Sequence, residues 1–203
     1  MMKMNKGILY VISAPSGCGK GTILTELFKR TDNLHYSVSA TTRAPREGEI
    51  DGKSYYFITR DEFEKKIADG GMFEYAEFCG NYYGTPKDKV FEKLNEGISV
   101  ILEIETIGAM KVKEAYPEAV MIFILPPKVS TLRERLIGRG TETLDVIEKR
   151  VGEAESEIRK SYNYDYILVN DDLDEAVDGL ETIMKSVKYI TKLNHKTIEG
   201  VLD

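Results

Sequence analysis

The sequence predicts an α/β fold in which a parallel β-sheet is covered by helices on both faces. Short, almost wholly apolar runs recur along the chain, as expected for strands that are buried on both sides. Segments with helical spacing of apolar residues separate these runs, so strand and helix alternate. A polar stretch from about residue 39 to 85 interrupts the alternation. It predicts a small β-rich insertion at the carboxyl edge of the sheet, where open α/β sheets bind ligands.

Five apolar runs predict the strands of the parallel sheet. They are Ile8–Ile12, Tyr36–Ser39, Ser99–Ile104, Ala119–Leu125 and Tyr166–Val169. The insertion contains two further runs with strand character. These are Tyr55–Ile58 and Met72–Phe78, the second followed by a turn at Gly80-Asn81.

Helices are predicted where apolar residues recur at helical spacing and capping residues stand at the ends. They run from Ile23 to about Arg30, Thr59 to Asp69, Lys87 to Glu96, Gly108 to Tyr116, Val129 to Ile137, Leu144 to Ile158, and Asp172 to about Lys192. Thr59 with Glu62 and Asp172 with Glu175 have the spacing of N-terminal caps, and Thr85-Pro86 that of an N-cap followed by a first-turn proline. Gly138-Arg139-Gly140 is expected to break a helix, and His195–Asp203 to form a loose tail.

Composition narrows the function classes. A chain of 203 residues is long enough for one domain with a sizeable core. The net charge of −6 argues against a nucleic-acid binder with a broad basic face, though not against a local arginine cluster that grips a phosphorylated small molecule. Cys18 and Cys79 form neither a disulfide framework nor a metal-ligand spacing, which indicates a reducing compartment. The apolar run behind Met1–Lys6 is too short for a signal or membrane helix, so we expect a cytoplasmic protein with no membrane partner.

The stretch Ile8–Arg30 predicts a phosphate-binding loop. A buried strand is followed by the Gly-rich segment Ser13–Gly19, and Lys20 then opens a helix. In this context, backbone N–H groups and the positive end of the helix dipole converge on a phosphate, and the lysine adds a full charge. The alternative is a Gly-rich turn with a solvated lysine, which the presence of both the strand and the helix disfavours.

The loop departs from the G-x-x-x-x-G-K-[ST] pattern at two positions. Ala14 stands at the first glycine position, which is tolerated if the backbone there does not need a positive φ. Gly21 follows Lys20, and the hydroxyl comes one place later at Thr22. This shift leaves open whether Thr22 or a loop serine lies near magnesium. The helix dipole would lower the pKa of a thiol at Cys18, but the alternative that Cys18 is only a small filler residue is favoured.

Two arginines in the segment Ser39–Arg46 predict a second anion site. Arg43 and Arg46 are separated by Ala44-Pro45 in a stretch with little apolar content. Each guanidinium can hold phosphate oxygens bidentately, so the pair suits a dianionic monophosphate held apart from the Gly-rich loop. The alternative is a solvated basic loop.

The segment Met72–Thr85 carries side chains suited to a base. Glu74 lies on a strand rich in aromatic residues, and its carboxylate can accept two parallel hydrogen bonds from a ring N–H and the neighbouring amino group. Guanine presents this edge and adenine does not. Tyr83 and Thr85 bring hydroxyls into the adjoining Gly-rich turn. Taken singly, such tyrosines are more often core or surface residues, and only the presence of Ser39, Arg43 and Arg46 in the same chain favours a role in binding.

Four arginines between residues 133 and 150 predict a closing segment. Arg139 lies between two glycines, a flexible place for a lid hinge, and Arg150 follows on the next helix. Arginines delivered by a lid neutralise charge on a transferring phosphoryl group while water is expelled. Helix-surface ion pairing with nearby glutamates is the alternative, and we assign Arg133 and Arg135 to it.

The sequence closely resembles the guanylate kinase family. The resemblance is collinear, spans nearly the whole chain, and rests on Ser13–Lys20, Ser37–Arg46, Tyr82–Thr85, Gly138–Glu142 and Asn170–Asp172. The segment around Arg43 and Arg46 is far more specific than the phosphate loop, which many unrelated folds share. The resemblance implies a P-loop kinase with a core of residues 1–38, 100–137 and 158–203, a GMP-binding region of residues 39–99 and a helical lid of residues 138–157.

The resemblance also implies residue roles. ATP would be bound by Ala14, Pro15, Ser16, Gly17, Cys18, Gly19, Lys20, Gly21, Thr22 and Asn170, the last of these near the adenine. The phosphate of GMP would be held by Arg43, Arg46, Tyr55 and Tyr83, and its guanine read by Ser39, Glu74 and Thr85. The catalytic residues would be Lys20, Arg43, Arg139 and Arg150. Glu105 stands where the family usually has aspartate, and its extra methylene puts the contact with the base or the metal in doubt.

The reaction implied is the magnesium-dependent transfer of a phosphoryl group from ATP to GMP, and to dGMP. The expected partners are therefore these nucleotides, with no nucleic acid, and the chain would be a monomer or a homodimer. A rival is a kinase of the same fold that phosphorylates a sugar phosphate, against which Glu74 and Thr85 speak. Another is a guanylate-kinase-like scaffold that binds peptides without catalysis. Such scaffolds typically lose the phosphate loop or the lid arginines, whereas this chain has Lys20, Arg139 and Arg150.

Overall fold

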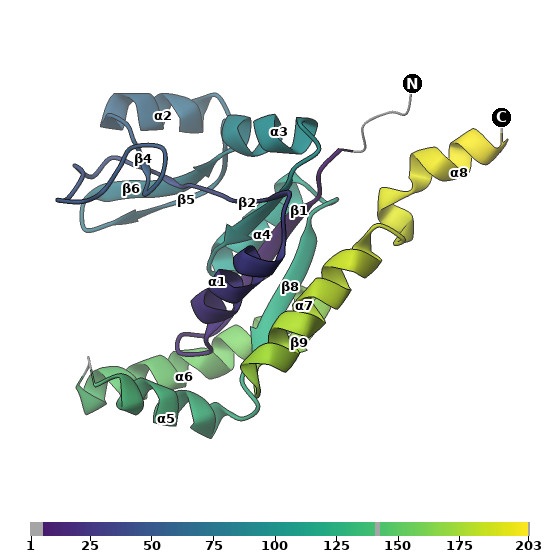
Figure 1. Ribbon diagram of the computed structural model, residues 1–203. Helices are drawn as coiled ribbons and strands as arrows, with labels where there is room; N and C mark the ends of the chain where they lie inside the picture. The colour runs from purple at the N-terminus through teal and green to yellow at the C-terminus, as the bar shows by residue number, and fades with distance from the viewer. Residues whose placement is uncertain (1–5, 141–142, 203) are drawn as a thin grey trace. The chain divides into compact units, whose positions relative to one another are not determined.

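The computed structural model describes residues 6–140 and 143–202 of the chain (Figure 1). Contacts between Cα atoms group it into two compact units. One unit holds the chain up to Val11 together with Asn33–Ala119, and the other holds Ile12–Asp32 together with the chain from Val120 onward. Among the described residues, no helix combines the length and the apolar character needed to cross a membrane.

A five-stranded sheet has the strand order β2-β7-β1-β8-β9. Its strands are β1 (Leu9–Ser13), β2 (Leu34–Tyr36), β7 (Ser99–Glu103), β8 (Val120–Leu125) and β9 (Tyr166–Val169). Strand β2 pairs in parallel with β7, and β8 with β9. Every residue of β1 is buried, as the apolar run predicts for a strand covered on both faces. The predicted α/β class, with a parallel sheet flanked by helices, is confirmed.

The predicted insertion is a second, four-stranded sheet of order β4-β3-β6-β5. Its strands are β3 (Ala40–Thr41), β4 (Tyr56–Phe57), β5 (Met72–Phe78) and β6 (Asn81–Pro86). The β3–β4 pair is parallel and the other two pairs are antiparallel, so the sheet is mixed. The fully buried Phe63 of helix α2 (Arg60–Ala68) stacks on the ring of Tyr82, with centroids 5.1 Å apart, which joins helix and sheet.

The remaining helices of the first unit are α3 (Lys87–Asn95) and α4 (Thr106–Ala115). Those of the second are α1 (Lys20–Arg30), α5 (Val129–Arg139), α6 (Leu144–Lys160), α7 (Leu173–Val187) and α8 (His195–Leu202), with 3₁₀ turns at Ser161–Asn163 and Thr191–Leu193. The capping box of Thr59 with Glu62 is confirmed, and the Asp172 side chain accepts a hydrogen bond from the Glu175 N–H as predicted.

Four expectations about the ends of elements and the C-terminal segment are wrong. Thr85 and Pro86 belong to β6, and the Thr85 hydroxyl donates to Glu74 and does not cap α3. Helix α5 runs through Gly138 to Arg139, because only Gly140 adopts the left-handed conformation that ends it. The chain from His195 to Leu202 is a helix and not a loose tail, while α7 ends at Val187 rather than near Lys192.

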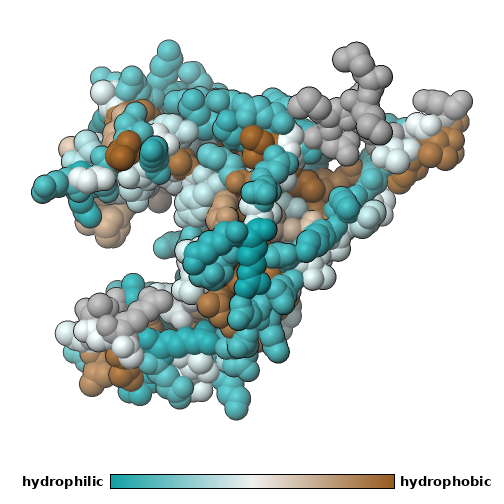
Figure 2. All heavy atoms as spheres, viewed as in Figure 1, coloured by the Kyte–Doolittle hydropathy of each residue, from teal (hydrophilic) through white to brown (hydrophobic). Residues whose placement is uncertain are grey.

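The C-terminal helix α8 carries apolar side chains that remain exposed. Ile198, Val201 and Leu202 lie three and four residues apart on this helix, which gives it an apolar stripe. The stripe contributes to the hydrophobic colour at the C-terminal end of the molecule in Figure 2.

Gly84 of β6 gives a test of the packing in the second sheet. A Cβ atom at this position would lie 2.6 Å from the Glu74 carbonyl oxygen and 2.9 Å from the Tyr75 Cβ. Since backbone cannot yield as a flexible side chain does, we expect Gly84→Ala to lower the free energy of unfolding by about 1–3 kcal/mol. The control is Gly152→Ala on α6, where a Cβ meets nothing within 4 Å and where alanine should stabilise the helix by about 0.5–1 kcal/mol. Urea unfolding of both variants measures the difference, and equal stability of the two would contradict the packing described.

Candidate active site

The predicted phosphate loop joins β1 to α1. Gly17 and Gly19 both have a φ of 85°, in the region that glycine adopts without strain. A Cβ at Gly19 would lie 2.6 Å from the Asn170 side-chain nitrogen, so this position is closed to larger residues on steric grounds as well. Gly19 also begins α1 without any side chain capping the helix, which leaves its N-terminus suited to an anion.

Ala14 does not disturb the loop. Among the described residues, only Asn33 and Cys79 combine a positive φ with a side chain, so Ala14 occupies its position without that strain. The loop is further fixed by a hydrogen bond from the Cys18 N–H to the Pro15 carbonyl at 3.1 Å. Alanine is therefore tolerated at the first position of the loop, because the backbone there does not need a positive φ.

Cys18 is the filler residue and not a reactive thiol. Its side chain is buried, and its Sγ lies 3.5 Å from the Ile124 carbonyl, to which the thiol donates. Burial raises the pKa of this thiol to about 12, against the opposing influence of the positive charges on Arg135 and Lys20. The favoured prediction of a filler residue is confirmed, and the alternative of a lowered pKa is wrong, because desolvation of the thiolate outweighs the helix dipole.

Beside the loop lies a cavity of about 330 Å³. It is lined by Gly17, Gly19, Thr22, Arg135, Gly138, Asn170, Asp171 and Leu173. Buried Asn170 donates from its side-chain nitrogen to the Cys18 carbonyl at 2.6 Å, which fixes the segment after β9 to the loop. The structure thus brings Asn170 and Thr22, both named from the sequence, to one cavity.

Arg135 was assigned to surface ion pairing, and that assignment is wrong. Its guanidinium donates to the Asn170 carbonyl at 3.0 Å and lines the loop cavity. Arg133, by contrast, forms the expected ion pair with Glu148 at 2.6 Å, which joins α5 to α6. The signal that reveals Arg135 is its spacing of three residues from Gly138, which puts both on one face of α5 once the helix continues through Gly138.

Arg150, which the sequence assigns to a predicted lid, lies half-buried on α6. Arg139 is the last residue of α5, and its side chain lies outside the described part of the structure, as do Thr141 and Glu142 of the same predicted motif. Lys20 is the first residue of α1.

The first unit contains a second cavity, of about 100 Å³, lined in part by Ser39, Tyr55 and Thr85. The Thr85 hydroxyl donates to a carboxylate oxygen of Glu74 at 2.6 Å. Three of the residues named for binding GMP therefore line one cavity, and a fourth is bonded to its wall. Tyr36, which also lines the cavity, donates to Glu103 at 2.9 Å.

Burial raises the pKa of the Glu74 carboxyl above its usual value. Hydrogen bonds from Thr85 and the positive charge of Lys111 oppose the rise, and the negative charge of Glu105 adds to it. Glu105 itself is exposed and immediately precedes α4. The second carboxylate oxygen of Glu74 lies 3.2 Å from where a Cβ of Gly108 would be, so a glycine there leaves room for it.

Arg43 lies in an aromatic setting with the two predicted tyrosines. Its guanidinium is 5.6 Å from the ring centroid of Tyr55, and the rings of Tyr55 and Tyr83 meet edge to face at 6.0 Å. Arg43 pairs with Glu49 through two hydrogen bonds of 2.8 and 3.0 Å. Glu49 also accepts from the Arg46 backbone N–H at 2.7 Å, while the Arg46 side chain is exposed.

Sequence reasoning missed Glu49. The signal for it is a carboxylate three residues after the second arginine of a short polar loop, close enough for both arginines to reach.

Within the described residues, no three His, Cys, Asp or Glu side chains gather in a way that would hold a metal ion. The side chains of the loop cavity that could donate oxygen ligands to a metal ion are the exposed hydroxyl of Thr22 and the exposed carboxylate of Asp171. Oxygen ligands in small number suit Mg²⁺, which keeps several waters and takes the rest of its shell from phosphates. This donor set fits magnesium carried on a nucleotide.

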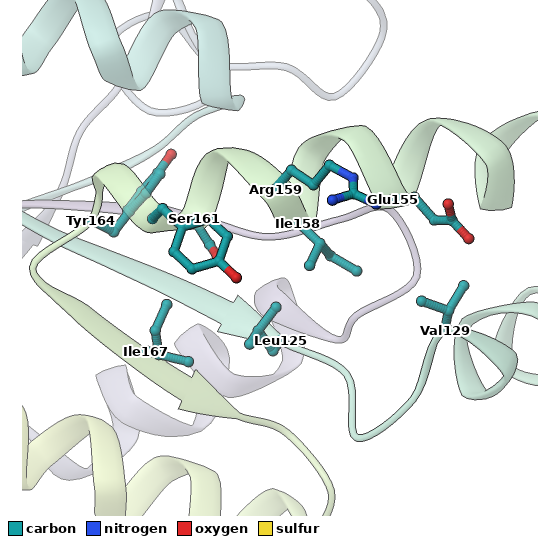
Figure 3. A pocket seen from close by; sticks show the side chains of 9 residues that line it. Leu125, Val129, Glu155, Ile158, Arg159, Ser161, Tyr164 and Ile167 are labelled. Carbon is teal, nitrogen blue, oxygen red and sulfur yellow. The ribbon is translucent and has the colours of Figure 1, made fainter.

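A further cavity of about 700 Å³ contains none of the residues named for the site. Figure 3 shows Leu125 and Ile167 on its β8 and β9 side and Glu155, Ile158 and Arg159 of α6 on the other. Its lining combines apolar and polar side chains, and it is separate from the loop cavity and from the cavity lined by Ser39, Tyr55 and Thr85.

The Gly-rich loop between a buried strand and a helix, on a parallel sheet flanked by helices, defines a P-loop nucleotide-binding protein. The family model described as guanylate kinase matches residues 6–187. The guanylate kinase of Carboxydothermus hydrogenoformans is 52% identical over 203 residues, covering 98% of this chain and 100% of that protein. That of Halalkalibacterium halodurans is 50% identical over 183 residues, or 90% of each chain. The crystal structure of guanylate kinase from Anaplasma phagocytophilum has a TM-score of 0.69 at 34% identity, covering 93% of this chain and 89% of that one. The chain belongs to the guanylate kinase family.

Proposed function

We propose that the phosphate-loop cavity and the group of residues around Arg43 and Glu74 bind the two substrates of the guanylate kinase reaction. In this reaction the γ-phosphoryl group of ATP passes to GMP or dGMP to give ADP and the diphosphate. One observation carries the proposal: the same chain contains a phosphate loop and a separate arginine site, and the half-buried carboxylate of Glu74, which suits guanine, lies in the unit that holds the arginine site. A kinase that joins two phosphorylated nucleotides needs two such anion sites.

In the first unit, Arg43, Arg46, Tyr55 and Tyr83 hold the phosphate of GMP. Ser39, Glu74 and Thr85 read the guanine. Glu74 accepts hydrogen bonds from the N–H and amino groups of the base, while the Thr85 hydroxyl occupies part of its other lone-pair capacity at 2.6 Å. Glu105 adds a negative charge beside Glu74, which favours donor groups on the base.

In the second unit, loop residues Ala14–Thr22 hold the phosphates of ATP, with Asn170 near the adenine. Arg135 lines the same cavity and joins this set. Magnesium, when bound to ATP, neutralises phosphate charge as a Lewis acid, and Thr22 is the hydroxyl that would reach it. Lys20, Arg139 and Arg150 neutralise the γ-phosphoryl group during transfer.

The chemistry needs no covalent enzyme intermediate. A phosphate oxygen of GMP attacks the γ-phosphorus, and the bond from that phosphorus to the oxygen of the β-phosphate breaks as ADP leaves. Because the nucleophile is already an anion, the protein has to position the two phosphates, neutralise their charges and exclude water. We assign positioning to residues 39–99, exclusion of water to a lid of residues 138–157, and the scaffold to the rest of the chain. We place the enzyme in the cytoplasm, as a monomer or a homodimer.

Steady-state assays with GMP, dGMP, AMP, UMP and dTMP test the proposed substrate. We expect turnover of GMP and dGMP and little of the others, because only guanine presents adjacent N–H and amino donors to Glu74. Omission of Mg²⁺ or addition of a chelator in excess should abolish turnover. Equal turnover of AMP and GMP would remove the base-reading role of Glu74.

A further inference from the structure

The Glu49 carboxylate is held by three donors in the loop after β3. Its two oxygens accept from the two terminal nitrogens of Arg43 at 2.8 and 3.0 Å, and one of them also accepts from the Arg46 backbone N–H at 2.7 Å. Glu49 thus ties the first arginine of the loop to the backbone of the second. A carboxylate with three donors is strongly oriented, and it orients its partners in return.

The pair is well shielded for an ion pair in a loop. Only 16% of the Arg43 side chain and 21% of the Glu49 side chain are exposed. The guanidinium also lies 5.6 Å from the ring centroid of Tyr55 and 5.8 Å from that of Phe57. Bidentate geometry, reduced exposure and aromatic neighbours each separate this pair from an ordinary surface salt bridge.

Within the part of the chain that the structure describes, the hydrogen bonds to Glu49 and Ala44 leave one edge of the Arg43 guanidinium for another acceptor. A guanidinium has five N–H groups. The Nη1 nitrogen uses its two on Glu49 and on the Ala44 carbonyl at 2.7 Å, and Nη2 uses one on Glu49. The remaining Nη2 hydrogen and the Nε hydrogen lie side by side on the adjacent edge of the guanidinium. This edge matches the spacing of two phosphate oxygens. The pKa of the Arg43 guanidinium is raised first by its hydrogen bonds to Glu49 and then by the neighbouring Tyr83 hydroxyl, so its charged form is favoured.

We propose that Glu49 is a positioning residue for substrate phosphate: it holds the Arg43 guanidinium by its terminal nitrogens, so that the Nε–Nη2 edge is fixed in place for the phosphate of GMP. This inference rests on the proposed role of Arg43. It adds a residue that does not touch the substrate and acts only through the arginine. Pre-organisation of this kind improves affinity because the arginine loses less side-chain freedom on binding.

The opposite arrangement is that the Glu49 carboxylate occupies the place of the phosphate and is displaced by it. The two arrangements predict opposite changes in GMP affinity when the Glu49 carboxylate is removed. A positioning carboxylate strengthens GMP binding, whereas a displaced one competes with it. The hydrogen-bond count favours positioning, since one guanidinium edge remains while Glu49 stays bound.

The test compares Glu49→Gln with wild type, with Glu49→Asp as the conservative variant and Glu47→Gln as the control. Glu47 is exposed in the same loop. Dissociation constants for GMP and for guanosine, which lacks the phosphate, are measured by calorimetry on the full chain. We expect Glu49→Gln to weaken GMP binding about tenfold, the loss of roughly one charge-assisted hydrogen bond, and to leave guanosine unchanged. Glu49→Asp should recover part of the loss, Glu47→Gln should match wild type, and KM for ATP should not move.

A double variant shows whether Glu49 acts through Arg43. Arg43→Ala with Glu49→Gln should bind GMP no more weakly than Arg43→Ala alone, because nothing remains to be positioned. Unchanged or tighter GMP binding by Glu49→Gln overturns the inference, and so do an equal loss for guanosine and additive losses in the double variant. These experiments measure binding and do not require the enzyme to turn over. A wild-type chain that binds GMP but makes no GDP therefore contradicts the proposed function alone, and one that does not bind GMP contradicts both.

Discussion

Lys20→Ala is expected to lower kcat on the order of 100-fold or more, with a smaller change in KM for either nucleotide. Lys20 is the first residue of α1, directly after the left-handed Gly19, so its ammonium group adds to the positive end of the helix. A cation that acts on the γ-phosphoryl group contributes most when negative charge shifts in the transition state. Its loss therefore appears in kcat more than in KM.

Lys29→Ala on the same helix is the matched control. Lys29 lies in the last turn of α1, exposed, and pairs with Glu26 at 2.7 Å. Its replacement should leave both kcat and KM unchanged within about twofold, as expected for a surface ion pair. Steady-state kinetics with both substrates varied make the comparison. Should Lys20→Ala raise KM for ATP while kcat stays near wild type, the lysine would serve ground-state binding and not transfer.

Glu74→Gln is expected to weaken GMP binding by about 1–3 kcal/mol, or roughly 5- to 150-fold. Glutamine replaces one carboxylate oxygen by an NH₂ donor, which then faces a donor of the guanine or the hydroxyl of Thr85. The matched control is Glu77→Gln, an exposed residue of the same strand. It should bind GMP as wild type does. Retention of wild-type affinity by Glu74→Gln would contradict the base-reading role.

The pH dependence of binding adds a second readout for Glu74. Burial raises the pKa of its carboxyl in the protein without ligand, so it takes up a proton at a higher pH than an ordinary glutamate does. The protonated carboxyl accepts fewer hydrogen bonds, and guanine affinity should therefore fall as the pH drops through this raised pKa. Stability has the opposite dependence on pH: ionisation of a carboxyl whose folded pKa is raised disfavours the folded state, so the destabilising contribution of Glu74 grows as the pH rises through that interval. Guanosine is the ligand of choice because it has no phosphate that titrates. The acid limb should be absent from Glu74→Gln.

Most of the fold was predictable because it depends on local pattern. Wholly apolar runs marked the parallel strands, and the capping residues Thr59 and Asp172 marked helix starts that the structure confirms. The errors arose where a distant partner decides the outcome. Thr85 has the sequence of an N-cap but donates to Glu74 on the neighbouring strand, a pairing that local sequence does not contain.

The same distinction applies to the site. The phosphate loop was recognisable from its glycines and its flanking elements, since the backbone itself forms such a site. Arg135 was assigned wrongly because its acceptor, the Asn170 carbonyl, lies 35 residues away in sequence. The filler role of Cys18 was predicted, but the rise in its pKa was not, because the helix dipole is visible in the sequence and the burial that overrides it is not. Glu49 was missed because the two arginines alone were considered, without the anion that orients them.

A crystal structure with GMP and a non-hydrolysable ATP analogue bound together tests the central claim most directly. That claim is that two separate groups of cationic side chains bind the phosphates of two nucleotides. We expect Arg43, Tyr55 and Tyr83 on the GMP phosphate, and Lys20 and Arg150 on the γ-phosphate of the analogue. A complex in which GMP lies away from Arg43, or in which Lys20 and Arg150 contact no phosphate, would contradict the account.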